Sequence, residues 1–80
     1  MRLPKKIVFP GGYKVKIKYR PDSFFNEHNC DAMWTDDYID TGIIYLNKSH
    51  SKKKQFRAFK HEINHAFIDW LFYYTHYVLK

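Results

Sequence analysis

The chain has 80 residues and a formal net charge of +6, with 45% hydrophobic and 20% aromatic residues. A chain of this length forms one small domain at most, and its apolar content excludes an intrinsically disordered protein. The single cysteine, Cys30, excludes an internal disulfide and indicates a reducing, cytoplasmic location.

The N-terminal part of the chain predicts a β-hairpin. Residues 7–9 are apolar and β-prone, Pro10-Gly11-Gly12 is a turn signal, and residues 13–19 alternate apolar and basic side chains. The apolar positions are expected to cover a core: Tyr13, Val15, Ile17 and Tyr19. The lysines at the alternate positions 14, 16 and 18 favour a solvated face, and contact with a nucleic acid is the alternative.

Residues 23–40 show no sustained periodicity and predict a polar loop. We expect large apolar side chains to pin this loop onto the core: Phe24, Phe25, Met33 and Trp34. The alternative is that Trp34 and Tyr38 line a cleft. His28 and Cys30 are metal-ligand types, but a loop histidine and a small buried thiol are the favoured interpretation.

A turn signal at Asp40-Thr41-Gly42 precedes a compact strand at residues 43–47. Ser49 or Ser51 can then cap a helix, because a serine oxygen accepts hydrogen bonds from the first free backbone amides. From about Lys52 onward there is no Gly or Pro, so the sequence predicts one helix running nearly to the C-terminus.

A helical projection of this segment predicts two faces. The face expected to pack on the sheet carries Phe56, Phe59, Ile63, Ala66, Phe67 and Trp70. The opposite side is expected to carry Ala58, His61, Glu62, His65, Asp69, Phe72 and His76. Core packing and chemistry are thus expected on separate sides of one helix.

The opposite side contains a match to the H-E-x-x-H pattern, His61-Glu62-Ile63-Asn64-His65. Histidines four residues apart project from one helix face and can share a metal ion. The intervening Glu62 can take a proton from a metal-bound water as general base, which makes water the nucleophile. The alternative is two histidines and a glutamate on a solvated face.

Catalytic zinc usually takes three protein ligands and a water, so a third ligand is required. His76 and Asp69 are candidates, although Asp69 is better placed to orient the imidazole of His65. Further candidates are His28, Cys30, Asp36, Asp37, Asp40 and His50, or a residue beyond position 80. The third ligand is left open.

The segment from Ile68 to Lys80 is aromatic on nearly every side, but it is too short and too polar for a membrane span. Such all-round apolarity predicts that more protein covers it, either a partner chain in an oligomer or a C-terminal continuation. The basic run Lys52-Lys53-Lys54 favours a solvated surface, and substrate steering or acid binding is the alternative.

Residues 43–47 together with residues 55–67 resemble small zincin-type metallopeptidase domains, of the kind found in ImmA/IrrE-like proteins, SprT-like proteins and short phage-encoded relatives. The resemblance implies that His61 and His65 bind Zn²⁺, that Glu62 is the catalytic base, and that the strand with Ile44, Tyr45 and Leu46 is the edge to which a peptide substrate adds. Those families usually draw the third ligand from a later helix as Glu or His, and no acidic residue follows Asp69 here.

Taken together, the sequence predicts one α+β domain over residues 1–80, with a small antiparallel sheet packed on a long C-terminal helix. The expected function is that of a cytoplasmic zinc peptidase acting on a peptide or protein, in the host cytoplasm if it is phage-encoded. The alternative is a non-catalytic basic module that binds nucleic acid or a protein partner, with a structural or vestigial metal site.

Overall fold

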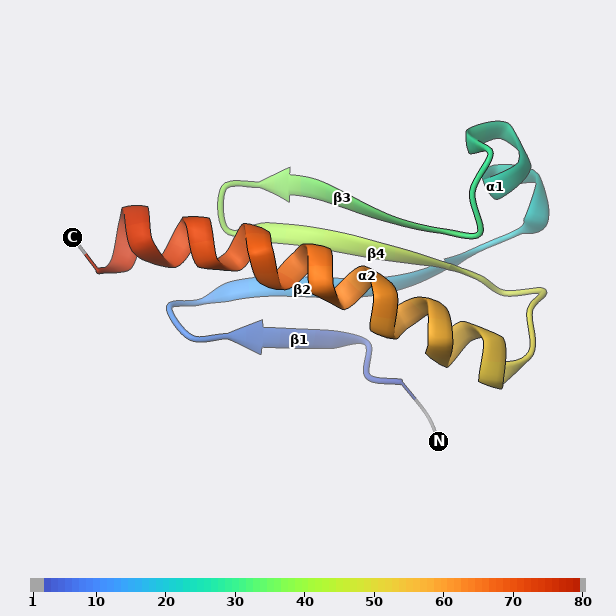
Figure 1. The fold of residues 1–80 in the computed structure, drawn as a ribbon, viewed down its shortest axis with the longest axis horizontal. Coiled ribbons are helices and arrows are strands. Elements are labelled where there is room, and N and C mark those ends of the chain that lie inside the picture. Colours follow the sequence, from blue (N-terminus) through green and yellow to red (C-terminus); the bar gives the residue numbers. More distant parts are fainter. Residues whose placement is uncertain (1–2, 80) are drawn as a thin grey trace.

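One four-stranded sheet, with the strand order β1-β2-β4-β3, carries a long helix along one face (Figure 1). The computed structural model describes residues 3–79. In chain order the elements are β1 (Lys6–Phe9), β2 (Tyr13–Arg20), α1 (Asp22–His28), β3 (Ala32–Tyr38), β4 (Thr41–Asn47), α2 (Lys52–Tyr73) and the π-helical turn η1 (Tyr74–Val78). The α+β class and the long C-terminal helix are confirmed.

The N-terminal hairpin forms as the alternation predicts. Gly11 and Gly12 make the turn with φ of 84° and 86°, which residues with a side chain rarely adopt. Tyr13, Val15 and Ile17 are buried, but Tyr19 is 40% exposed, so its predicted place in the core is wrong. The reason is that β1 pairs with β2 only as far as Lys16, which leaves Tyr19 without a neighbour on that side.

The sheet is mixed rather than purely antiparallel, which corrects one part of the prediction. β2 and β4 pair in parallel, whereas β1 with β2 and β3 with β4 pair antiparallel. The chain reaches this arrangement because α1 and β3 lie between β2 and β4 in the sequence, so β4 returns in the direction of β2. An antiparallel sheet of consecutive hairpins would have needed β3 beside β2.

The strand expected at the edge is internal. β4 lies between β2 and β3 and is hydrogen-bonded on both sides, so Ile44, Tyr45 and Leu46 cannot accept an added peptide strand. Consecutive burial of Ile43 and Ile44 is the pattern of a central strand, which has a neighbouring strand on each side. The edges of the sheet are β1 and β3.

The segment predicted to be a loop folds into α1 and β3. Asn29 ends α1 in the left-handed conformation, with φ of 54° and ψ of 47°. Phe25 is buried beneath α1, as the pinning role predicted, whereas every residue of β3 keeps some exposure. β3 shows no clear alternation in the sequence because an edge strand of mixed exposure needs none.

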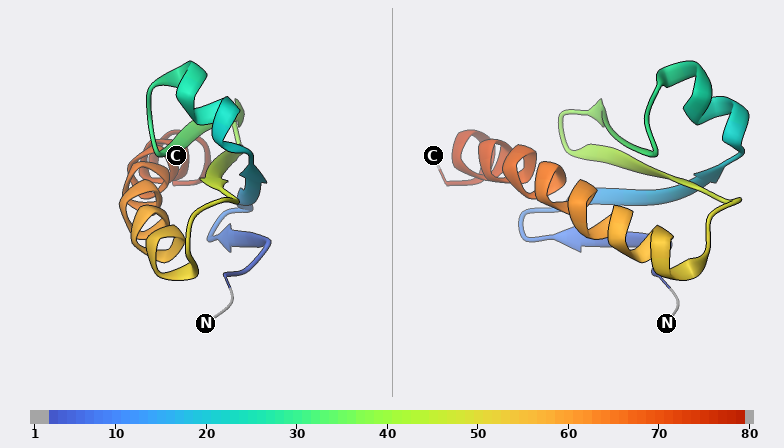
Figure 2. Two further views of the ribbon diagram at one scale, coloured as in Figure 1. Left: turned by 90° about the vertical axis from the view of Figure 1, so that its right-hand side faces the viewer. Right: turned by 45° about the vertical axis from the view of Figure 1, so that its right-hand side comes forward.

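Helix α2 begins after Ser51, whose Oγ accepts a hydrogen bond from the Lys54 amide at 3.2 Å. This selects Ser51 over Ser49 as the cap. Figures 1 and 2 show α2 crossing one side of the sheet and leaving the other side uncovered. No helix within residues 3–79 has the length and apolarity needed to cross a membrane.

The sheet-facing side of α2 matches the predicted one at Phe59, Ile63, Ala66 and Trp70, which pack in or against the core, and differs from it at two positions. Its buried residues are Glu62 and Ala66, whereas Phe67 is 51% exposed. Asp69 follows Glu62 at seven residues, which returns to the same helix face. The predicted separation of core and chemistry is therefore wrong, because two acidic side chains lie along the inner side of the helix.

Candidate metal centre

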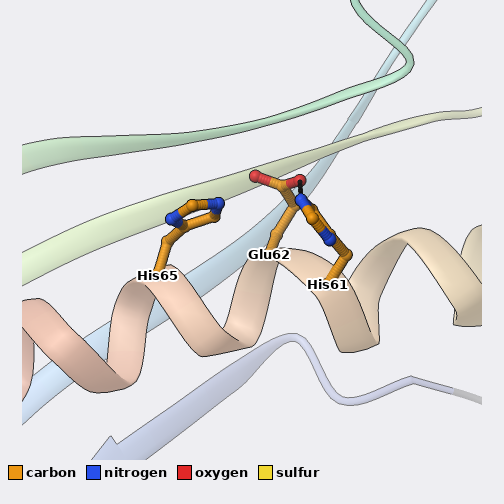
Figure 3. Close-up of side chains that lie close together, drawn as sticks. All are labelled: His61, Glu62 and His65. Carbon is orange, nitrogen blue, oxygen red and sulfur yellow. Dashed lines mark ion pairs between the residues drawn. The ribbon is translucent and has the colours of Figure 1, made fainter.

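Helix α2 brings His61, Glu62 and His65 together as the sequence predicts. Each offers one ligand atom, and these atoms all lie within 4.8 Å of one another. The two imidazole rings lie 5.3 Å apart, centroid to centroid, because residues four apart are neighbours on a helix surface. Figure 3 shows both rings and the carboxylate pointing to the same side of α2.

The three side chains differ strongly in exposure. The His61 side chain is 73% exposed and that of Glu62 is 12% exposed, with Nε2 and Oε2 separated by 3.9 Å. Glu62 is held between the helix and the sheet, whereas the histidines stand at the rim. The recessed carboxylate therefore lies beside two accessible imidazoles that can bind a ligand.

A pocket of about 520 Å³ opens beside His61 and Glu62. Its remaining walls come from the connection into β3, the connection into α2 and the first turns of α2, and comprise Cys30, Asp31, Ala32, His50, Lys54, Arg57 and Ala58. Within residues 3–79 no buried side-chain nitrogen or oxygen lacks a hydrogen-bond partner. The Glu62 carboxylate, which makes no hydrogen bond, therefore keeps its oxygens open to this pocket.

Two of the weaker third-ligand candidates, Cys30 and His50, line this pocket. Neither belongs to the group of mutually close donor atoms, which consists of His61, Glu62 and His65 in the described part of the chain. Asp31 lines the same pocket and is not among the ligand candidates that the sequence offers. No local signal marks it, because residues 30–32 reach the helix only through the pairing of β3 with β4, on which α2 packs.

The two preferred third-ligand candidates lie outside the group of close donor atoms in residues 3–79, so the third ligand stays open. Asp69 Oδ2 accepts a hydrogen bond from Trp34 Nε1 at 2.5 Å and so serves β3 rather than His65. His76 Nδ1 lies 2.9 Å from the carbonyl of Phe72, and the helix does not bend back toward His65. Asp69 and His76 both line a separate pocket near Tyr13.

The other histidine and acidic candidates are also engaged away from the centre. His28 Nδ1 lies 2.8 Å from the carbonyl of Phe24, within α1. Asp40 Oδ1 accepts from the hydroxyl of Thr41, and Asp36 lines the pocket near Tyr13. The compact centre is thus limited to the H-E-x-x-H residues.

With Glu62 as the base, the centre supplies two of the three protein ligands that a catalytic zinc ion usually takes. Imidazole nitrogens and carboxylate oxygens are donors that Zn²⁺ takes, and the adjoining pocket leaves room for a water and a substrate. Comparison with protein-family models, with curated proteins and with solved structures finds no match to this chain.

Proposed function

We propose that this chain is a zinc-dependent peptidase. The proposal depends on one observation. Glu62 is recessed beside a pocket, and the ligand atoms of Glu62, His61 and His65 lie within 4.8 Å of one another on the same helix. In this role the two imidazoles hold the metal from the open side. Bound zinc would lower the pKa of a coordinated water and polarise the scissile carbonyl.

Glu62 performs the proton transfers. Its carboxylate faces the pocket with free oxygens, so it takes a proton from the attacking water and passes it to the departing amine. Burial against the sheet restricts its rotamers, which keeps the oxygens beside the imidazoles. The exposed His61 needs no such restriction until it binds metal.

The substrate edge in this proposal is β3, in place of residues 43–47. β3 is an edge strand, and Ala32 at its start lines the same pocket as His61 and Glu62. Further along, Trp34 contacts Asp69, so β3 runs beside α2 past the centre. Free backbone groups on such an edge can pair with an extended peptide and place it across the pocket.

The deciding experiment compares Glu62→Gln with Glu27→Gln. These are the only two glutamates in the chain, and Glu27 lies exposed on α1, so the second variant controls for the lost charge. With zinc supplied, the wild type and Glu27→Gln should cleave an unfolded casein substrate, and Glu62→Gln should bind zinc but lose cleavage by a factor of at least about 100. Normal cleavage by Glu62→Gln would exclude its role as base, and a wild type that binds no zinc would exclude the metal centre.

A second function is favoured by the uncovered face of the sheet. Lysines 14, 16 and 18 lie on β2 away from the buried Tyr13, Val15 and Ile17, and Lys6 pairs beside Lys16. In residues 3–79 the one ion pair joins His61 to Glu62, so these lysines have no acidic partner. We propose nucleic-acid binding as the alternative activity of this face.

This alternative makes a salt-dependent prediction. Replacing Lys14, Lys16 and Lys18 with Gln should weaken binding to single-stranded RNA and flatten its dependence on salt, because fewer counterions are released. The matched control replaces Lys52, Lys53 and Lys54 at the start of α2. Equal loss in both triple variants would point to net charge rather than to the sheet face.

A further inference from the structure

A second pocket, of about 500 Å³, lies near the C-terminal end of α2 and is separate from the metal centre. It is formed where the β3–β4 hairpin, the start of β2 and the last turns of the helix meet. Its lining includes Tyr13, Asp36, Asp69, Phe72, Tyr73 and Tyr77. The proposed peptidase chemistry uses none of them.

Two carboxylates from different elements meet in this pocket. Asp36 comes from β3 and Asp69 from α2, and both side chains line the pocket. Trp34 holds Asp69 in place through its indole N–H. No Lys or Arg lines the pocket in the described residues, so the pair has no positively charged partner of that kind.

Tyr13 points to a ligand independently of the acids. It is only 2% exposed, and its hydroxyl makes no hydrogen bond to any group in residues 3–79. Because no fully buried side-chain oxygen or nitrogen of those residues is unpaired, the hydroxyl must meet solvent in the pocket. A buried side chain with a free hydroxyl at the pocket surface is a ready hydrogen-bond partner.

The walls around these oxygens are aromatic. The Tyr73 ring lies 5.3 Å from the ring of Tyr13 and 5.8 Å from that of Tyr77, centroid to centroid. The Tyr73 hydroxyl donates to the carbonyl of Gly11 at 2.6 Å, which fixes its ring. Aromatic faces next to carboxylates favour an organic cation, because ring quadrupoles attract positive charge.

A metal ion fits this pocket poorly. Among residues 3–79, the group of three close donors lies at His61, Glu62 and His65 and includes no residue of this pocket. Of the pocket's possible ligands, His76 already has Nδ1 at the Phe72 carbonyl. Two carboxylates, one hydroxyl and an aromatic wall instead match the three N–H donors of an ammonium group.

We propose that this pocket binds a primary ammonium group, carried either by a free amine or by a lysine side chain. The ammonium donates to Asp36, Asp69 and the hydroxyl of Tyr13, and the attached methylenes pack on Tyr73 and Tyr77. Ammonium binding at this pocket does not depend on zinc, so its test is independent of the test of the proposed peptidase.

The test is an NMR titration of the ¹⁵N-labelled chain with n-butylamine and with Nα-acetyl-lysinamide at neutral pH. Both probes should give saturable shifts at the amides around Tyr13 and Asp69. Tighter binding of Nα-acetyl-lysinamide would identify a lysine side chain as the ligand, and equal binding would identify the ammonium group alone. The diacetylated lysinamide, which has no positive charge, should give no saturable shift.

Matched variants locate the site. Asp36→Asn should weaken n-butylamine binding by about tenfold or more, because one charged acceptor is lost. Asp37→Asn removes the same charge from the neighbouring residue, outside the pocket lining, and should change the affinity less than about twofold. Tyr13→Phe, which removes only the hydroxyl, should weaken binding several-fold.

Three results would overturn the proposal. The first is no saturable shift with either amine in the wild type. The second is an equal effect of Asp36→Asn and Asp37→Asn on affinity, which would mean non-specific attraction to negative charge. The third is saturable binding of the diacetylated probe, which would show that the pocket recognises the apolar part alone.

Discussion

Trp34 donates the indole hydrogen bond that Asp69 Oδ2 accepts, and this contact joins the edge strand β3 to helix α2 across 35 residues of sequence. It holds β3 beside the helix that carries the metal centre. The same contact places Asp69 in the second pocket and away from His65. One hydrogen bond thus decides which site Asp69 belongs to.

We expect Trp34→Phe to lower the free energy of unfolding more than Trp70→Phe does. Both changes remove an indole donor, but Trp34 donates to a carboxylate and Trp70 to the carbonyl of Pro10. Hydrogen bonds to charged groups contribute about 1.5–3 kcal/mol and neutral ones about 0.5–1.5 kcal/mol. Urea denaturation measures both, and a larger loss for Trp70→Phe would contradict the ranking.

Gly42 is predicted to be intolerant of a side chain. A Cβ at this position would lie 1.9 Å from Cη2 of Trp34, whose ring covers the glycine. Gly42→Ala should therefore cost about 1–3 kcal/mol of stability through overpacking. In the Trp34→Phe background the same change should cost clearly less, because contacting residues are not additive. An unchanged cost in that background would show that the backbone, rather than Trp34, requires glycine.

The cap of α2 gives a smaller and more local prediction. Ser51→Ala should lower the free energy of unfolding by about 1 kcal/mol, since Ser51 Oγ accepts from the Lys54 amide. Ser49→Ala is the control, because Ser49 uses only its backbone amide, which donates to Asn47 Oδ1. Thermal unfolding of the two variants should separate them, and equal losses would mean that the two serines share the cap.

Zinc should stabilise the folded chain in a way that depends on the histidine pair. At a zinc concentration of about 100 times Kd, the expected gain is about 2.7 kcal/mol, because metal binds the folded centre and not the unfolded chain. The rise in melting temperature should vanish in His65→Ala and persist in His76→Ala, whose side chain lies in the other pocket. A rise that survives His65→Ala would place the ion elsewhere.

The pH dependence of stability should report the Asp36–Asp69 pair. Desolvation raises the pKa of Asp36 above its ordinary 3.8, and the hydrogen bond with Asp69 and its charge raise it further. The folded chain therefore binds the proton more tightly than the unfolded chain. The stability from this proton is complete below the unfolded pKa and is lost as pH rises through the folded pKa.

Asp36→Asn should consequently gain stability relative to the wild type between about pH 4 and neutral pH. Urea denaturation at both ends of that window measures the difference. Asp37→Asn carries the same charge change outside the pocket lining and should show no such gain. A constant difference between wild type and Asp36→Asn across the window would mean that Asp36 titrates normally in the folded state.

Local patterns in the sequence determined the elements that are governed by neighbouring residues. The hairpin followed from its glycines and the alternation after Tyr13, and α2 followed from Ser51 and the absence of helix breakers. The grouping of His61, Glu62 and His65 needed only the helical repeat, so it was predictable without a fold. Their catalytic roles remain a proposal.

Tertiary structure alone decided which strand is the edge and that Glu62 and Asp69 lie on the inner side of α2. Strand order depends on how β4 returns beside β2, which no local pattern encodes, so Ile44 proved internal and β3 took the edge. The helix turned Glu62 and Asp69 toward the sheet, because the small Ala66 allows close approach and Trp34 offers Asp69 a donor. Both pockets arise from these long-range choices, since each joins residues that only packing brings together.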